Sequence, residues 1–180
     1  MREGGRAIET ALIGAPACGW VLLGVAEWIG LPAAPTNPLE VAIALLSIVA
    51  AAIALGAVTD RLADLIFDVW LGRGLRRRFL GSDAAYYGSY RQLFEGRRGP
   101  LVPLARARSL MRLCRGWSLN TLLALAVFNA AVWTRPLAEA LPRERYVAIH
   151  GALSLAVALF VFAYRRFLIS ELRRLAMLSS

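Results

Sequence analysis

The stretch that most constrains the fold runs from Val41 to Phe79, where an apolar segment passes directly into a charged one. Val41–Leu55 is almost purely apolar, and the following Gly56–Phe79, GAVTDRLADLIFDVWLGRGLRRRF, contains three aspartates and ends in an arginine cluster. No proline interrupts the stretch, so we expect one helix over Pro38–Leu71, about 50 Å long at about 1.5 Å per residue. The hydrocarbon core of a bilayer is only about 30 Å thick, so the last turns must project beyond it. Gly72 and Gly74 are candidate positions for the helix to end or bend.

Apolar blocks recur along the rest of the chain, which has 180 residues, of which 58% are hydrophobic. This pattern predicts an all-α, polytopic membrane protein with four transmembrane helices. The expected spans are about 7–31, 39–58, 118–133 and 146–164. The whole chain, 1–180, is then a single membrane domain. Within it, the extensions of the second and third helices form a cytoplasmic helical hairpin over 59–117.

The basic residues, all of them arginine, orient these spans. Eleven arginines lie between Arg73 and Arg115 and four between Arg165 and Arg174, whereas the two opposite loops carry none and three. The positive-inside rule therefore places both termini and the central loop in the cytoplasm of a bacterial plasma (inner) membrane. The net charge of +9 then favours contact with anionic phospholipid headgroups, and nucleic acid is not an expected partner.

Two charged stripes face each other across the central loop. Asp60, Asp64 and Asp68 recur every four residues and share one helix face, as do Arg108, Arg112 and Arg115. Antiparallel extensions would pair Asp60 with Arg115, Asp64 with Arg112, and Asp68 with Arg108. We interpret these six residues as a structural ion-pair ladder, because arginine is a planar, bidentate partner for carboxylates near a membrane. An acidic catalytic or metal site is the alternative.

A second polar pair, Glu27 and His150, is expected in the outer third of the membrane. Ionisable groups at this depth suggest a proton relay, whereas the structural interpretation is a hydrated or hydrogen-bonded interfacial pair. Asn120 and Asn129 in the third span are interpreted as interhelical hydrogen-bonding residues.

Arginines and tyrosines are interleaved between residues 73 and 98, and Ser82 is a candidate cap for a helix over Asp83–Glu95. Such a composition suits a phospholipid surface as well as nucleotides or single strands. Tethering at both ends to the membrane favours the lipid. The expected lipid or anionic-ligand contacts are Arg76, Arg77, Arg78, Arg97 and Arg98.

The sequence contains no nucleotide-binding, metalloprotease or nucleophile-elbow motif, and its two cysteines, Cys18 and Cys114, are expected at different depths. We therefore expect no catalytic residues, no metal and no cofactor, and a protein that is not an enzyme.

Two segments, TDRLADLIFDVW with the following arginine cluster and RARSLMRLCRGWSLN, resemble paired segments of uncharacterised bacterial four-span membrane proteins of similar length. The resemblance implies that the two segments form one module, and it implies no activity.

The function expected from these features is that of a non-enzymatic integral membrane scaffold or interaction subunit. It would work as a homo-oligomer or beside a larger membrane partner. One alternative is an oligomeric ion channel or membrane-disrupting effector gated by the arginine-rich cytoplasmic module. Another is a small proton-coupled transporter.

Overall fold

The computed structural model describes residues 3–29, 37–95, 101–134 and 142–179, and within them every element is helical. In chain order, the helices are α1 (Glu3–Ile29), α2 (Pro38–Phe67), the π-helical turn η1 (Asp68–Gly72), α3 (Arg73–Leu80), α4 (Asp83–Glu95), α5 (Leu101–Thr134) and α7 (Arg143–Ser179). The prediction of an all-α chain is therefore confirmed for the described residues.

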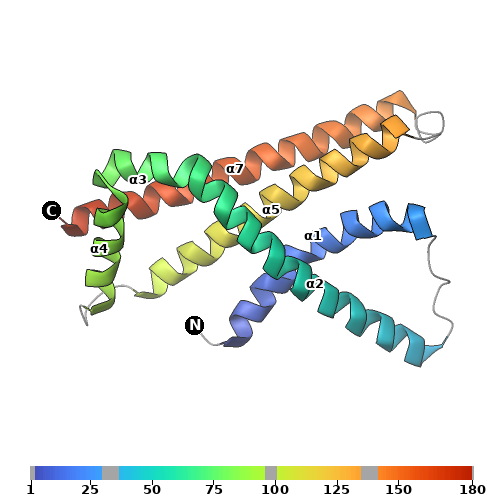
Figure 1. Cartoon of the computed structure of the whole chain (residues 1–180), viewed down its shortest axis with the longest axis horizontal. Helices are drawn as coiled ribbons and strands as arrows, with labels where there is room; N and C mark the ends of the chain where they lie inside the picture. The colour runs from blue at the N-terminus through green and yellow to red at the C-terminus, as the bar shows by residue number, and fades with distance from the viewer. Residues whose placement is uncertain (1–2, 30–36, 96–100, 135–141, 180) are drawn as a thin grey trace.

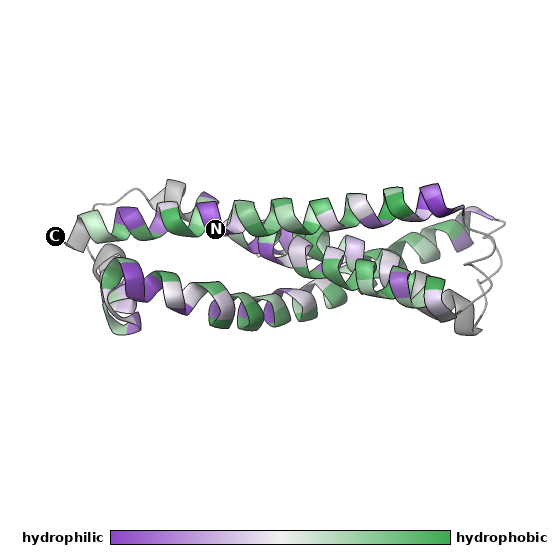
Figure 2. Cartoon of the chain, turned by 90° about the horizontal axis from the view of Figure 1, so that it is seen from above, coloured by the Kyte–Doolittle hydropathy of each residue, from purple (hydrophilic) through white to green (hydrophobic). Residues whose placement is uncertain are grey.

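Four long helices form two hairpins that cross near the middle of the molecule (Figure 1). α1 packs against α2, α5 packs against α7, and both helices of the first hairpin contact α5. Beyond the crossing the hairpins diverge, towards the right in Figure 1. The short helices α3 and α4 lie at the other end, together with the end of α7, whereas α1 begins nearer the middle of the molecule. Figure 2 shows hydrophobic residues along most of the length of the long helices.

The helix that begins at Pro38 does not stop at Gly72 or Gly74. It passes through the π-helical turn and continues to Leu80. A π-turn widens the helix locally and is tolerated where side chains need the room. Here a Cβ on Gly72 would come within 2.9 Å of both Asp68 and Arg76, so the glycine leaves space for these two side chains to meet. The helix ends at Gly81, whose φ of 78° is left-handed and favours glycine.

Side-chain caps are present at two helix starts. Asn37 precedes α2, and its Oδ1 accepts a hydrogen bond of 2.9 Å from the amide of Glu40. Ser82 precedes α4, and its Oγ accepts a hydrogen bond of 3.0 Å from the amide of Ala85. Each side chain satisfies an amide that the first helical turn leaves without a backbone partner.

Three helical segments are long and apolar enough to cross a membrane: Pro38–Leu80, Arg106–Trp133 and Arg143–Met177. They include the predicted second, third and fourth spans, and they indicate a membrane protein. α1 forms the helix expected for the first span and runs through Pro16 without interruption, but it is not among these three segments. Other parts of the chain bury only a small share of the residues in the most apolar part of each segment. In Arg143–Met177 that part has no buried residue.

Candidate functional site

The first hairpin, beside its contact with α5, is built on close backbone approach between α1 and α2. A Cβ added to Gly14 would overlap the carbonyl oxygen of Ala52, and one added to Gly56 would overlap the carbonyl oxygen of Thr10. Only glycine permits helix axes to come this near. Gly14 and Gly56 therefore fix where the two helices cross.

α5 joins this contact through polar side chains. Asn120 is fully buried and donates a hydrogen bond of 2.5 Å from Nδ2 to the carbonyl oxygen of Ile13, while Trp20 Nε1 donates to Asn120 Oδ1 at 3.3 Å. About three turns before Asn120 on α5, Ser109 Oγ donates a hydrogen bond of 2.5 Å to Glu9 Oε1 of α1. The interpretation of Asn120 as an interhelical hydrogen-bonding residue is therefore confirmed.

The aspartate and arginine stripes meet beside the crossing, in a register that differs from the prediction. Arg112 Nη2 lies 2.8 Å from Asp60 Oδ2, and Arg115 pairs with Asp64 through Nη1 and with Asp60 through Nη2, the latter at 3.3 Å. Of the three predicted pairs, Asp60–Arg115 is present and Asp64–Arg112 is wrong. Arg112 is also 3.5 Å from Glu9 Oε2, so the first helix supplies an acid that the pairing scheme omitted. That extra acid draws Arg112 one turn towards Asp60.

The predicted pair of Asp68 with Arg108 is also wrong, because Asp68 binds an arginine of its own helical rod. Arg76 Nη2 donates to Asp68 Oδ2 at 3.1 Å, and Arg76 Nε donates to Asp83 Oδ1 at 2.6 Å. Arg76 thus ties the π-helical turn to the start of α4, and it is buried, with 6% of its surface exposed. It is therefore not available as the lipid contact expected of it. The same guanidinium holds the pKa of the exposed Asp83 carboxyl below its usual value.

Arg108 instead reaches α7 and α4. Its Nε lies 3.6 Å from Glu171 Oε1 and donates a hydrogen bond to the hydroxyl of Tyr90 at 3.2 Å, with the guanidinium carbon 3.9 Å from the centre of the Tyr90 ring. Glu171 is buried, and neither of its carboxylate oxygens has a hydrogen-bond partner among the described residues. Tyr86 packs on Tyr90 with ring centroids 4.9 Å apart, and burial raises the pKa of Tyr86. This cluster fastens α4 to the α5–α7 hairpin.

A separate polar group lies between α5 and α7, away from the crossing. Asn129 Oδ1 accepts a hydrogen bond of 2.9 Å from the Tyr146 hydroxyl and lies 3.2 Å from His150 Nδ1. The ring of Tyr146 also stacks on Phe128, with centroids 5.6 Å apart. His150 thus has Asn129 as a neighbour. The side chain of Glu27, its expected partner, lies outside the described residues, so the Glu27–His150 pairing stays a prediction.

Four further arginines were predicted to contact lipid, and the structure describes the surroundings of two of them. Arg77 and Arg78 are exposed on α3, in agreement with a surface role. Arg97 and Arg98 lie outside the described residues.

Three acids of the site, Glu9, Asp83 and Glu171, had no role predicted from the sequence. The spacing of apolar residues in α7 indicates that Glu171 is buried. This acid falls on the same helical face as the buried Leu168, Leu172 and Leu175.

Chemically, the crossing is a network of charge-assisted contacts that joins all the long helices. Glu9, Asp60, Asp64, Asp68, Asp83 and Glu171 each face an arginine. Within the described ranges no three His, Cys, Asp or Glu side chains are grouped so that they could hold a metal ion. Comparisons of the chain with protein-family models, with curated proteins and with solved structures gave no significant match.

Proposed function

We propose that this chain is a non-enzymatic membrane scaffold subunit that crosses the membrane four times and assembles with further copies of itself. Its main support is the combination of a cross-linked junction with uncovered apolar helices. Ion pairs and hydrogen bonds hold α1, α2, α5 and α7 together over about three turns of α5, from Arg108 to Asn120, whereas the two hairpins diverge beyond this region (Figure 1). A rigid junction from which uncovered apolar helices extend suits a subunit against which other membrane helices pack.

The first span would be α1, which begins in the same half of the molecule where α7 ends (Figure 1). An even number of spans puts both termini on one side of the membrane, in agreement with the arginine-rich side being cytoplasmic.

The proposed self-association surface is a row of small residues on the exposed side of α2. Ser47, Ala50, Ala54 and Ala57 recur at intervals of three or four residues and are exposed in the single chain. In a bilayer, apolar helices gain little from burial alone and associate where small side chains allow close backbone approach. The opposite side of α2 already uses this principle against α1, through Gly56. A second copy is therefore a better match for this row than bulky lipid chains.

The particle mass of the full chain in lipid nanodiscs tests this function. We expect two or more copies per particle for the wild type, and a shift to one copy for Ala54→Leu, because the larger side chain separates the paired helices. Ala158→Leu is the matched control, since Ala158 is an exposed alanine on α7, and it should keep the wild-type mass. A wild-type particle with one copy contradicts self-assembly.

Ion flux into liposomes separates the scaffold from the channel alternative. We expect flux through vesicles that contain the protein to equal that of empty vesicles. Flux that rises with protein density and is lost in Ala54→Leu would replace the scaffold with an oligomeric channel.

A further inference from the structure

α7 has a buried face and a basic face beyond the predicted fourth span. Leu168, Leu172 and Leu175 are at most 5% exposed, and the first two belong to one core cluster with Phe67 and Met111 of other helices. This packing fixes the rotation of the helix about its axis. The opposite face is therefore presented in a defined direction, and it carries four arginines.

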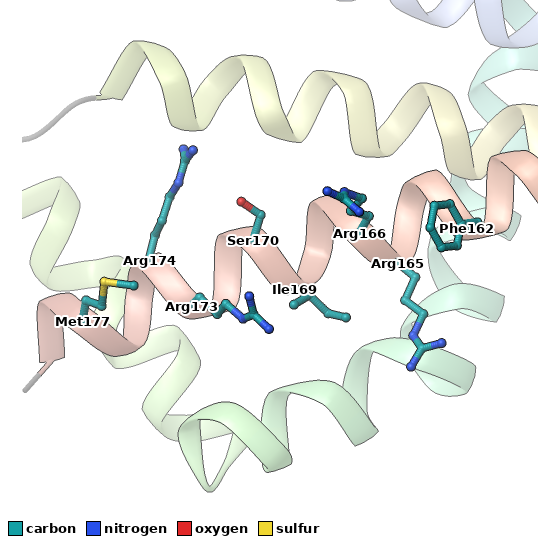
Figure 3. Close-up of a pocket in the computed structure, with 8 residues that line it drawn as sticks. All are labelled: Phe162, Arg165, Arg166, Ile169, Ser170, Arg173, Arg174 and Met177. Carbon is teal, nitrogen blue, oxygen red and sulfur yellow. The ribbon is translucent and has the colours of Figure 1, made fainter.

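The arginines form two parallel rows along the helix. Arg166, Ser170 and Arg174 recur every four residues on the side towards α5, and Arg165, Ile169 and Arg173 recur every four residues on the other side (Figure 3). We call Arg165, Arg166, Ser170, Arg173 and Arg174 the α7 arginine stripe. Its two arginine pairs are eight residues apart, or about 12 Å at about 1.5 Å per residue.

These arginines differ from those of the junction because no carboxylate among the described residues lies within ion-pair distance of them. All four are exposed, and none forms an ion pair with a carboxylate in the part of the chain that the structure describes. The two arginines within each pair are adjacent and repel each other, because they lie within the screening length of about 8 Å in physiological salt, whereas repulsion between the two pairs is largely screened. The repulsion is relieved when an anion binds between them.

The stripe borders an open surface hollow of about 560 Å³, whose lining residues all belong to α7 and which gives an anion access to the guanidinium groups. The hollow is also lined by Phe162, Ile169 and Met177, so apolar surface lies within reach of the charged groups (Figure 3). Ser170 and Arg174 are shared with a second hollow of about 260 Å³ beside α5, where Arg106 adds another exposed guanidinium. Glu171 lines this second hollow too, but its side chain is buried and faces Arg108 at 3.6 Å.

We propose that the α7 arginine stripe is a binding site for a phosphate group, supplied by an anionic phospholipid headgroup or by free phosphate. Guanidinium groups bind phosphate oxygens through paired N–H donors, and the Ser170 hydroxyl is a further donor. The stripe begins directly after the predicted fourth span, at the depth of the headgroups. A lipid would place its phosphate among the arginines and its glycerol and upper acyl chains against Phe162. This site is independent of the scaffold function proposed above.

Titration calorimetry of the full chain in a zwitterionic detergent tests the site. The probes are a short-chain phosphatidylglycerol and inorganic phosphate, and short-chain phosphatidylcholine serves as the zwitterionic reference. We expect the double variant Arg166→Gln, Arg173→Gln to bind phosphatidylglycerol about thirtyfold more weakly than the wild type, since each arginine near a phosphate contributes about fivefold. Unchanged helicity and thermal unfolding would show that the variant remains folded.

The matched control is Arg143→Gln, Arg145→Gln, which removes the same charge from two exposed arginines at the other end of α7. It should change the affinity by no more than about twofold. Inorganic phosphate that binds in the wild type, and is lost only in the stripe variant, would identify free phosphate as a ligand of the same site. Equal weakening in both double variants would overturn the site in favour of general surface charge. So would a wild type that binds neither probe better than phosphatidylcholine.

Discussion

At the scale of single residues, Gly14 and Gly56 set how closely α1 and α2 approach. Gly56→Ala should destabilise the protein by about 1–3 kcal/mol, because the added Cβ would overlap the backbone of Thr10 and force the helices apart. A control on the same hairpin is Gly19→Ala, where nothing lies within 4 Å of the added atom. The free energy of unfolding of that variant should rise by about 0.5–1 kcal/mol, because alanine has a higher helix propensity than glycine. Unfolding in mixed micelles of increasing denaturing detergent measures both, and equal stability of the two variants would contradict the close contact.

Asp83 gives the protein a defined response to acid. Its pKa is lowered in the folded state, chiefly by the hydrogen bond from Arg76. The ionised carboxylate therefore stabilises the fold at pH values above its ordinary pKa of about 4, and this contribution is lost as the pH falls through the lower, folded-state pKa. We expect the thermal unfolding temperature to drop more steeply below about pH 4 in the wild type than in Asp83→Asn. Parallel pH profiles for the two proteins would show that the contact with Arg76 does not form.

At the scale of elements, the register between α2 and α5 determines which acid each arginine meets. Arg112 contacts Asp60 at 2.8 Å and makes no ion pair with Asp64, whose partner is Arg115. A double-mutant cycle with Asp60→Asn and Arg112→Gln should therefore give a coupling free energy of about 1–2 kcal/mol, as expected for a half-buried pair.

The cycle with Asp64→Asn and Arg112→Gln is the matched comparison, because it tests the register expected from spacing alone. Its coupling free energy should be below about 0.5 kcal/mol. The opposite order of the two coupling energies would restore the sequence-derived register and show that Glu9 does not draw Arg112 towards Asp60.

At the scale of the whole molecule, the proposed topology places α4 and the far end of the α5–α7 hairpin on opposite sides of the membrane. Ala84 and Glu144 are exposed at these two places. With a membrane-impermeant thiol reagent, Glu144→Cys should react in intact spheroplasts, whereas Ala84→Cys should react only after permeabilisation. The native Cys18 is buried and Cys114 is half-buried, so the thiol reagent should label these two cysteines only weakly. Labelling of Ala84→Cys in intact spheroplasts would reverse the orientation.

The sequence by itself determined the helical elements and the starts of α2 and α4, because these depend on local chemistry. Long apolar runs require helices in a membrane, Asn37 and Ser82 cap the turns that follow them, and the spacing of the aspartates and arginines puts each set on one face. The bounds of α4 and the continuous rod out of α2 follow from the same local rules.

Only the tertiary structure decided which faces meet. Glu9 and Glu171 looked like isolated acids, yet the crossing of the hairpins brings the first to Arg112 and the second to Arg108. A π-helical turn lets Arg76 bind Asp68, which turns an expected surface arginine into a buried one. The helix spacing permits several registers of nearly equal charge complementarity. Packing of Gly14 against α2 and of Asn120 against α1 selects one of them, because backbone contact and buried hydrogen bonds tolerate far less displacement than charge attraction does.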